Sequence, residues 1–324
     1  MHKSVLLDES IEYLNLNDES NIVDCTLGYG GHSSEILKRI KRGFLFAFDQ
    51  DKDAIASSRK RLDEISNNYE IIYSNFSQLE AELNKRNVNH IDGILYDLGV
   101  SSPQLDEGDR GFSFHQDAKL DMRMNQDNPL SAWNVVNEYE YSKLVDIFYR
   151  YGEEKFASSI AKKIISSRPI DTTLELVEVI KSAVPEKYRR EKHPARKVFQ
   201  AIRIEVNDEL NVFESSLRQA LNIISKGGRI CVITIHSLED KICKEIFKEV
   251  TSVEPTLKNL PVIPDEFLPK YKVVKTISPS DSELEYNPRA RSAKLRVIER
   301  IGWWWWKRKR VLWDLIRKKN LYIV

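Results

Sequence analysis

A short glycine-rich segment, Gly28-Tyr29-Gly30-Gly31-His32, follows an apolar run and precedes a helical pattern. Glycines at such a turn let the backbone approach a ligand closely, and the amino end of the next helix faces the same ligand. The spacing is Gly-x-Gly-Gly, whereas dinucleotide-binding turns carry Gly-x-Gly-x-x-Gly. The segment indicates a cofactor loop, although a purely structural strand-to-helix turn would have the same composition.

Two acids, Asp49 and Asp51, end the next apolar run, about 20 residues beyond the glycine turn. An acid at this distance is placed to accept hydrogen bonds from the ribose hydroxyls of an adenosine-bearing cofactor. We assign that role to Asp49 and expect Asp51 to cap the helix that starts near Asp53. Together the two features predict an adenosine cofactor without separating a nicotinamide dinucleotide from S-adenosylmethionine.

A third polar segment follows the apolar run that ends at Asp97, and it reads Ser101-Ser102-Pro103-Gln104. In a doubly wound sheet this segment would lie at the carboxyl edge beside the first strand, where ligands bind. Small hydroxyl residues before proline form a stiff loop whose hydroxyls and carbonyls can accept hydrogen bonds from an exocyclic amino group. The segment therefore predicts a loop that faces the substrate.

The elements that must position these residues are short apolar runs rich in β-branched side chains. They cover residues 22–26, 44–48, 71–73, 91–96, 230–235, 271–274 and 295–298. Near-continuous apolar runs suit strands that are covered on both faces. Helical patterns over residues 33–40, 53–65 and 77–85 separate the first four runs. This alternation predicts an α/β fold with a mostly parallel, doubly wound sheet.

The alternation stops between Gln104 and Ile204, where only loop and helical patterns occur. Thr172 with Glu175 forms a capping-box signature at the start of one of these helices. Domain insertions are tolerated at loops whose ends lie close together. We therefore expect a discontinuous α/β domain over residues 1–104 and 205–302, a helical domain inserted at residues 105–204, and a separate tail at residues 303–324.

The charge is distributed unevenly between the tail and the rest of the chain. The chain of 324 residues has 50 basic and 49 acidic residues, but residues 303–324 hold seven of the basic residues and one acid. Residues 1–302 therefore carry a net charge of −5, and the tail also holds five of the six tryptophans. This distribution excludes a uniformly cationic coat for binding nucleic acid.

Cysteine and histidine give no sign of a disulfide framework or a metal site. Cys25, Cys231 and Cys243 lack paired spacing, and the six histidines are scattered without ligand spacing. No uncharged apolar stretch approaches the ~18 residues of a membrane span. Asp8 and Glu9 stand where the apolar part of a secretory signal would run. We expect a cytoplasmic protein without a bound metal.

Over residues 2 to 301 the chain resembles the bacterial 16S ribosomal RNA cytosine-N4 methyltransferase family, RsmH or MraW. The resemblance rests on His2-Lys-Ser-Val-Leu-Leu7 and on residues 24–32, 97–106, 110–114, 120–124, 199–207, 236–240 and 287–296. So many matches in the same order argue against chance. The resemblance implies a Rossmann-like class I methyltransferase fold with seven strands and S-adenosylmethionine as the cofactor.

Carried over onto matching positions, the resemblance also implies the residues that contact the cofactor. These are Gly30, Gly31 and His32 of the glycine turn, Asp49 at the ribose, Phe76 beside the adenine, and Asp97 and Gln104 near the methionine half. The reasoning from strand ends agrees for Asp49 and Asp97. Phe76 would equally suit ordinary core packing, and His32 would equally suit the first turn of its helix.

The activity that the resemblance implies is N4-methylation of one cytosine in the decoding region of 16S rRNA, free or within the small ribosomal subunit or a late precursor. A cytosine amino group is a poor nucleophile because its lone pair is delocalised, so in-line positioning matters. We predict direct displacement without a metal or a covalent intermediate. Ser101, Ser102 and the carbonyls before Pro103 would accept the amino hydrogens, as in the similar Asp/Asn/Ser-Pro-Pro loops of amino-methylating enzymes. Gln104 departs from that pattern, because it replaces the second proline.

RNA must be held by local patches of charge, since residues 1–302 are acidic overall. The candidates are Arg189, Arg190 and Arg196 in the insertion, and Arg289 and Arg291 near the last strand. Such contacts to phosphates give affinity without sequence information. Solvated charged faces would have the same composition. His236, after the fifth apolar run, suits either the active site or a helix cap.

Other functions remain open from the residues alone. A nicotinamide oxidoreductase is disfavoured by the glycine spacing, and a non-catalytic RNA-binding factor and a DNA amino-methyltransferase are further alternatives, although we expect no DNA substrate. The tail from Trp303 to Val324 has no expected counterpart in the family. It suits a lineage-specific or spurious extension, a membrane-surface anchor or an RNA-binding arm. The oligomeric state is not predicted.

Overall fold

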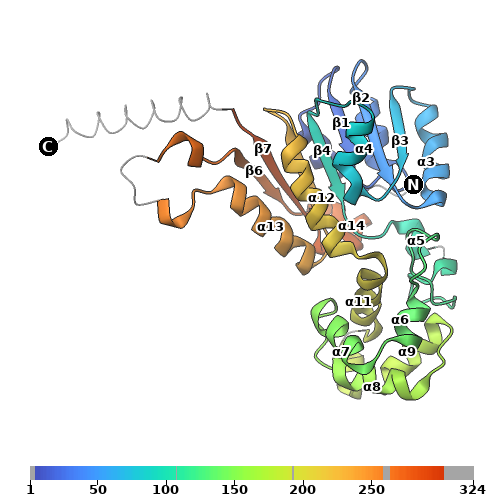
Figure 1. Ribbon diagram of the computed structural model, residues 1–324. Helices are drawn as coiled ribbons and strands as arrows, with labels where there is room; N and C mark the ends of the chain where they lie inside the picture. The colour runs from blue at the N-terminus through green and yellow to red at the C-terminus, as the bar shows by residue number, and fades with distance from the viewer. Residues whose placement is uncertain (1–3, 107, 192, 258–262, 303–324) are drawn as a thin grey trace.

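The computed structural model describes residues 4–106, 108–191, 193–257 and 263–302, and its described strands form one sheet (Figure 1). The strands are β1 (Asn21–Asp24), β2 (Phe44–Asp49), β3 (Tyr69–Tyr73), β4 (Gly93–Asp97), β5 (Arg229–Thr234), β6 (Tyr271–Ile277) and β7 (Lys294–Arg300). Their order is β3-β2-β1-β4-β5-β7-β6. The first five strands pair in parallel, and β7 pairs antiparallel with both β5 and β6. The predicted seven-stranded, mostly parallel sheet is confirmed.

Helices cover both faces of this sheet, as a doubly wound fold requires. On one face lie α1 (Leu7–Leu14), α2 (Gly31–Leu37), α3 (Lys52–Asp63) and α14 (Asp281–Tyr286). On the other lie α4 (Leu79–Lys85), α12 (Glu209–Ile223) and α13 (Ser237–Thr251). The strand order reverses between β1 and β4, because β2 and β3 lie on one side of β1 while β4 and β5 lie on the other. The switch between β1 and β4 places a ligand site at the carboxyl ends of these strands.

One sequence expectation about local structure was wrong, and another was confirmed with a different first turn. Residues 101–103 were expected to form a loop, but a short helix, α5 (Ser102–Asp106), begins at Ser102. Proline is favoured in the first turn of a helix because its missing N–H has no partner there in any case. The helix expected over residues 77–85 begins as the 3₁₀ turn η1 (Phe76–Gln78), capped by Asn75, and only then continues as α4. Further 3₁₀ turns are η2 (Gly108–Arg110), η3 (Pro255–Leu257), η4 (Asp265–Phe267) and η5 (Pro288–Ser292).

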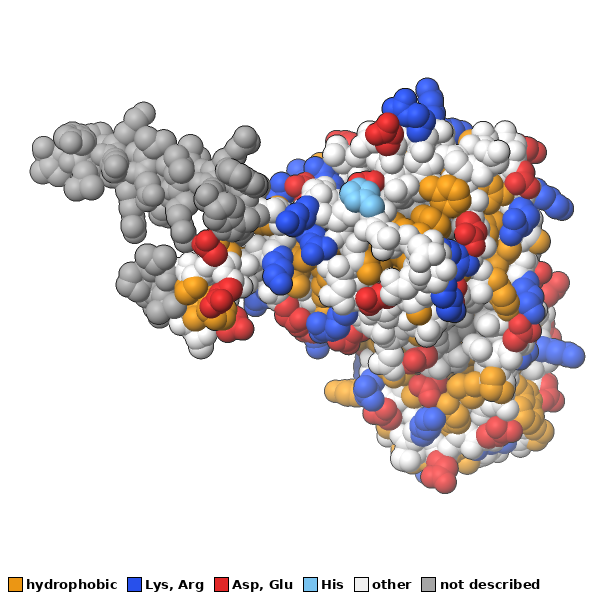
Figure 2. Space-filling model, turned by 45° about the horizontal axis from the view of Figure 1, so that its top comes forward, with side chains coloured by type: hydrophobic (Ala, Val, Ile, Leu, Met, Phe, Trp, Pro, Cys, Tyr) orange, Lys and Arg blue, Asp and Glu red, His pale blue; other side chains and the backbone are white. Residues whose placement is uncertain are grey.

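Charges of both signs are mixed over the surface. On the face drawn in Figure 2, Lys and Arg side chains alternate with Asp and Glu side chains, and no single basic field covers it. This agrees with the acidic balance of residues 1–302. Within the described ranges no helix is long and apolar enough to cross a membrane. The tail at residues 303–324 lies outside the described residues.

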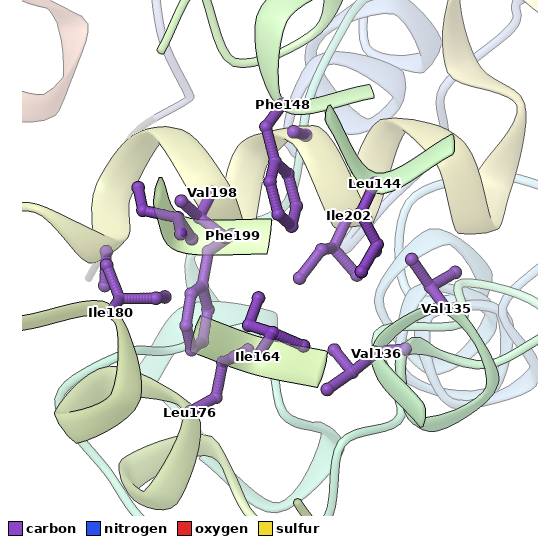
Figure 3. Packing of buried hydrophobic residues seen from close by; sticks show 14 of the residues in the cluster. Val135, Val136, Leu144, Phe148, Ile164, Leu176, Ile180, Val198, Phe199 and Ile202 are labelled. Carbon is purple, nitrogen blue, oxygen red and sulfur yellow. The ribbon is translucent and has the colours of Figure 1, made fainter. Parts of the chain in front are cut away.

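Between the fourth strand and α12, the residues from Phe112 to Val206 form a helical body with its own hydrophobic core (Figures 1 and 3). Its helices are α6 (Ala132–Glu138), α7 (Tyr141–Arg150), α8 (Ala157–Ser167), α9 (Thr173–Ser182), α10 (Glu186–Glu191) and α11 (Ala195–Asn207). Figure 3 shows Phe148, Phe199 and Ile202 among the side chains that meet in this core. The capping box of Thr172 and Glu175 is present as predicted. Helix α11 continues past residue 204 and buries Val206 in the same core.

Candidate active site

A cavity of about 390 Å³ opens at the carboxyl ends of β1, β2, β4 and β5. Its volume falls within the range of sites for small molecules. One wall is made of the glycine turn, Asp49, Phe76 and Asp97, followed by the start of α5. The lining also includes Asn207, Glu209, Glu239 and Asn287. All of the residues that the resemblance assigned to the cofactor except Gly30 line this cavity, and Gly30 lies between two of them in the chain.

The glycine turn has the left-handed backbone that its composition predicted. Gly30, with φ of 76°, is the N-cap of α2. A Cβ atom at Gly30 would lie 3.3 Å from the hydroxyl of Ser58, which donates a hydrogen bond to the Gly28 carbonyl over 2.6 Å. The buried carboxylate of Asp24 accepts bonds from the Ser33 hydroxyl (2.7 Å) and the Thr26 N–H (3.0 Å). These contacts fix the backbone of the turn where it meets the cavity.

Asp49 lies at the end of β2 and is tied to the glycine turn. Its carboxylate accepts the Gly28 N–H (2.8 Å) and the Asp51 N–H (2.9 Å). Burial raises the pKa of Asp49 to about 6 despite these two hydrogen bonds. The carboxylate still has free lone pairs beside the cavity, and these are the acceptors that a ribose diol would need.

Asp51 caps α3, as predicted, because its side chain accepts the Asp53 N–H over 3.0 Å. Its other oxygen has a role that sequence spacing did not reveal. It accepts a hydrogen bond from the Gln104 amide (2.8 Å) and forms a close ion pair with the Arg110 guanidinium. Asp51 is 3% exposed, so this ion pair is shielded from water. The contact fastens the cavity wall at β2 to the segment after β4.

Asp97 ends β4 and faces the cavity. Its N–H donates to the Thr26 hydroxyl over 2.7 Å, which fixes the end of the strand against the glycine turn. Burial raises the pKa of the Asp97 carboxyl to about 8, and the carboxylates of Asp24, Glu239 and Glu283 add to the effect. This carboxyl group is suited to accept a cationic ligand, which would offset the repulsion from its neighbours.

His32 was predicted either to contact the cofactor or to sit in the first turn of its helix. It lies in the first turn of α2 and also lines the cavity. Its Nδ1 atom is 3.5 Å from a carboxylate oxygen of Asp97. Burial lowers the pKa of His32 to about 4, so the ring is neutral at pH 7.

Gln104 fixes the segment that was expected to face the substrate. Its amide oxygen accepts the Ser101 N–H (3.0 Å), while the Ser101 hydroxyl accepts the Gln104 N–H at 3.4 Å. Its amide nitrogen donates to Asp51. Ser101, Pro103 and Gln104 all line the cavity, and the side chain of Ser102 is outside the described part of the structure. The glutamine that replaces a second proline thus supplies rigidity through hydrogen bonds.

Phe76 was predicted either to lie beside the adenine or to pack in the core. The ring lines the cavity, and it also packs edge-on against Tyr96 with the ring centroids 5.8 Å apart. Tyr96 is fully buried and hydrogen-bonded to the hydroxyl of Ser216 over 2.7 Å. Phe76 therefore packs against the core and borders the cavity, and its contact with an adenine stays a prediction.

A network of charges that sequence reasoning did not assign includes two of the cavity residues, Glu209 and Glu239. Arg203 donates to both carboxylate oxygens of Glu209 over 2.8 Å each. His236 is the N-cap of α13, and its Nε2 atom lies 3.0 Å from Glu239, which also accepts the Ile235 N–H at 2.9 Å. Glu239 lines the cavity and His236 does not, so of the two roles considered for His236 the cap is the one observed.

Glu209, His236 and Glu239 also form the one group of possible metal ligands within the described ranges, with ligand atoms within 4.8 Å of one another. Arg203 already neutralises Glu209 through a bidentate pair. A guanidinium at this distance would repel a divalent cation. The geometry thus describes an ion-pair network, and the expectation of a site without metal stays a prediction.

The arginines predicted to bind RNA have different surroundings. Arg190 pairs with Glu186 one turn earlier in α10, and Arg289 pairs with Asp106 over 2.8 Å. Arg189, Arg196 and Arg291 are exposed. The ion pairs of Arg190 and Arg289 are largely exposed to solvent, and such pairs contribute little to stability.

Comparisons with known proteins agree with the resemblance found in the sequence. Residues 1–301 match the model of the MraW methylase family. Ribosomal RNA small subunit methyltransferase H of Exiguobacterium sibiricum is 54% identical over 306 residues, which are 93% of this chain and 98% of that protein. The protein of the same name from Oceanobacillus iheyensis is 53% identical over 308 residues, 93% of this chain and 95% of that protein.

Among solved structures, a putative rRNA methylase from Clostridium thermocellum has a TM-score of 0.44 at 12% identity, over 93% of this chain and 100% of that chain. The assignment rests on the family model and on the two sequence relatives, which match nearly the whole chain. The chain belongs to the MraW methylase family and is a methyltransferase, as the resemblance predicted.

Proposed function

We propose that this protein transfers the methyl group of S-adenosylmethionine to N4 of a cytosine in the decoding region of 16S rRNA. One structural observation supports the proposal. The cavity brings a glycine turn and the strand-end acids Asp49 and Asp97 together with the Ser101–Pro103 segment. The ribosomal substrate is supported by the names of the two relatives, which are ribosomal RNA small subunit methyltransferases.

The cavity residues fit the proposed cofactor. Asp49 would accept hydrogen bonds from the ribose hydroxyls, and Phe76 would pack against the adenine. Gly30, Gly31 and His32 would also contact the cofactor. Asp97, among other carboxylates, would face the cationic methionine half, with Gln104 beside it. S-adenosylmethionine supplies an activated methyl group on a sulfonium, whose positive charge suits this acidic end of the cavity.

The methyl acceptor would lie against the start of α5. Ser101 uses its hydroxyl for a long hydrogen bond of 3.4 Å from Gln104 and keeps a lone pair for an amino group. The hydroxyl of Ser102 and the carbonyls before Pro103 would accept the remaining amino hydrogen. Holding the amino group in line with the transferred methyl lowers the barrier through positioning. A Ser102→Ala enzyme with full turnover would remove that residue from the proposal.

The helical insertion at residues 105–204 would recognise the substrate, and the rest of residues 1–302 would form the catalytic domain. Arg189, Arg190 and Arg196 would contact RNA phosphates from the insertion, and Arg289 and Arg291 from the end of the catalytic domain. The RNA would be presented within the small ribosomal subunit or a late precursor, and this substrate favours a cytoplasmic location. Any membrane contact would come from residues 303–324. Truncation after Gly302 with unchanged RNA methylation would leave an RNA-binding role for that tail without support.

Two measurements test the proposed function. Thermal unfolding with S-adenosylmethionine and with NAD should show stabilisation by the first alone, because a ligand that binds the folded state raises the melting temperature. Stabilisation by NAD alone would overturn the cofactor assignment. Methylation of free 16S rRNA and of small-subunit particles at successive assembly stages would then identify the substrate. Equal methylation of DNA and RNA would favour a DNA amino-methyltransferase instead.

A further inference from the structure

A second groove, of about 260 Å³, lies outside the candidate active site, between α13 and the strands β6 and β7. Figure 1 shows α13 running beside these two strands. Its polar lining comes from three segments. These are Lys244, Lys248 and Thr251 of α13 with Ser252 directly after it, Lys275 and Thr276 of β6, and Arg296 of β7. We call it the α13 groove.

Basic residues dominate the α13 groove. Of the ten described residues that line it, four are basic and none is acidic. Asp240, at the start of α13, neutralises Arg296 through bonds of 2.7 and 3.1 Å, and it lies 3.6 Å from Lys294. Asp240 is also one turn before Lys244, which contributes to its lowered pKa. One carboxylate thus faces Arg296, Lys294 and Lys244, and the balance around the groove is strongly positive.

Two lysines of the α13 groove lie close together on the helix. Lys244 and Lys248 are four residues apart on one face of α13, where like charges repel by about 0.2–0.5 kcal/mol. Glu245 lies three residues before Lys248, as Glu35 lies before Lys38 and Glu178 before Lys181, but only the latter two pairs form an ion pair in the part of the chain that the structure describes. A lysine cluster of this kind, on a body with a net charge of −5, would gain from a polyanion that neutralises it.

The α13 groove and the active-site cavity are lined by different residues of the same helix, α13. Glu239, in the first turn of α13, lines the cavity. With a rise of about 1.5 Å per residue, Lys244 lies about 8 Å and Lys248 about 14 Å further along the helix axis. A nucleic acid strand with one base in the cavity would pass these lysines with its neighbouring phosphates. Lysine ammonium groups and small hydroxyls are the side chains that typically bind phosphate oxygens.

We propose that the α13 groove binds the RNA backbone next to the target nucleotide, through Lys244, Lys248 and Lys275. The inference rests on the proposed RNA substrate and adds a site that is separate from the arginines of the insertion. These contacts supply affinity and position the strand, and they carry no sequence information.

The lysine on β6 has a competing explanation. β6 is an edge strand, its Val273 is 60% exposed, and lysines on edge strands prevent pairing with other chains. Lys244 and Lys248 are on a helix and have no such role. Changing Lys275 to glutamate separates the two explanations. A glutamate still places a charge at the edge of the sheet, as edge protection requires, but its negative sign would repel RNA phosphates.

The test compares two triple variants with equal changes in net charge. In the groove variant, Lys244, Lys248 and Lys275 are changed to Glu. In the control, the exposed Lys41, Lys60 and Lys226 are changed to Glu; Lys41 and Lys226 directly precede β2 and β5, at the edge of the sheet opposite the cavity. Filter binding of transcribed 16S rRNA is measured at several KCl concentrations, and stabilisation by S-adenosylmethionine is measured by thermal unfolding.

We expect the groove variant to bind the RNA at least tenfold more weakly than the control at low salt. The slope of log affinity against log salt should fall by about 2, since three single-strand phosphate contacts are lost at about 0.7 each. Stabilisation by S-adenosylmethionine should be unchanged, and a variant with Arg at the three positions should bind as wild type.

Equal binding by the groove variant and the control would overturn the inference and leave the proposed function intact. Weaker binding to small-subunit particles with unchanged binding to free rRNA would overturn it in favour of a protein partner. A wild-type protein that binds neither rRNA nor particles would instead overturn the proposed function.

Discussion

The Nδ1 atom of His32 lies 3.5 Å from a carboxylate oxygen of Asp97, where α2 meets the end of β4. Burial lowers the pKa of His32 to about 4 and is also the main reason that the pKa of Asp97 rises to about 8. At pH 7 the pair is therefore a neutral imidazole beside a mostly protonated carboxyl group. A cation bound next to Asp97 would favour its ionised form, so binding of a sulfonium ligand should be coupled to loss of a proton.

The first prediction concerns the pH dependence of cofactor binding. The affinity for S-adenosylmethionine should rise from pH 6 to pH 8, by up to about tenfold per pH unit, and level off above the pKa of Asp97. An Asp97→Asn variant should bind more weakly and lose this dependence. Isothermal titration calorimetry at four pH values, in buffers of different ionisation enthalpy, measures both the affinity and the proton released. Identical pH profiles for wild type and variant would contradict the coupling.

The second prediction concerns stability without the cofactor. The pKa of Asp97 is raised from 3.8 in the unfolded chain to about 8 in the folded protein, so the folded state holds the proton more tightly. Its contribution to stability is therefore lost as pH rises from about 4 to about 8. Asp97→Asn should raise the melting temperature by about 3 °C or more at pH 8.5, and by less at pH 5. A variant that melts below wild type at pH 8.5 would contradict this account.

The third prediction concerns the backbone of the glycine turn. Gly30 and Gly227 both have left-handed backbones, with φ of 76° and 84°, but a Cβ at Gly227 would meet nothing within 4 Å. Alanine at either position should cost about 1–2 kcal/mol of folding free energy because of the backbone strain. Only Gly30→Ala should also weaken cofactor binding. Melting temperatures and titrations of both variants check this, and equal cofactor affinities would exclude a cofactor role for the turn at Gly30.

The fourth prediction concerns Gln104, which connects Ser101 to Asp51. Gln104→Leu removes these hydrogen bonds at similar volume and should lower kcat at least tenfold, because the segment that positions the amino group loosens. Asn68→Leu is a matched control, since the Asn68 amide donates to the carbonyls of Ile40 and Gly43 over 2.7 Å each, beside the amino end of β2. Both variants should lose about 1–3 kcal/mol of stability. A normal kcat in Gln104→Leu would contradict the positioning role.

The fifth prediction concerns the insertion. Changing Arg189 and Arg190 to Glu should weaken RNA binding and reduce its dependence on salt, because contacts to phosphates are lost. Lys162→Glu with Lys163→Glu, on exposed positions of α8, provides an equal change of charge elsewhere in the insertion. Binding measured over a series of KCl concentrations compares the two. An unchanged salt slope in the arginine variant would discard that patch.

The strand-end acids could be predicted from sequence, because the carboxyl ends of neighbouring parallel strands meet at one edge. Asp49 and Asp97 line one cavity for that reason. The start of α5 could not be predicted, since Ser-Ser-Pro is typical of a loop and equally of a first helical turn. The contact of Gln104 with Asp51 joins residues 53 positions apart, and no local pattern reports such a contact.

The sequence also did not predict four other residues that line the cavity. Asn207 ends α11, the last helix of the insertion, and Glu209, Glu239 and Asn287 come later in the chain. Three of these four residues lie within segments that had marked the family resemblance, so a signal for them was present. Their placement depends on how α11, α13 and α14 pack, which spacing along the chain does not specify.

The most direct test of the central claim is the chemical identity of the methylated product. Small-subunit particles and 16S rRNA that lack the modification would be incubated with this protein and S-adenosylmethionine carrying a labelled methyl group. The RNA would then be digested and its nucleosides separated by mass spectrometry. We expect label in N4-methylcytidine from one position of the decoding region, and less label with Asp97→Asn. Label in 5-methylcytidine or another nucleoside, or no transfer to any RNA substrate, would contradict it.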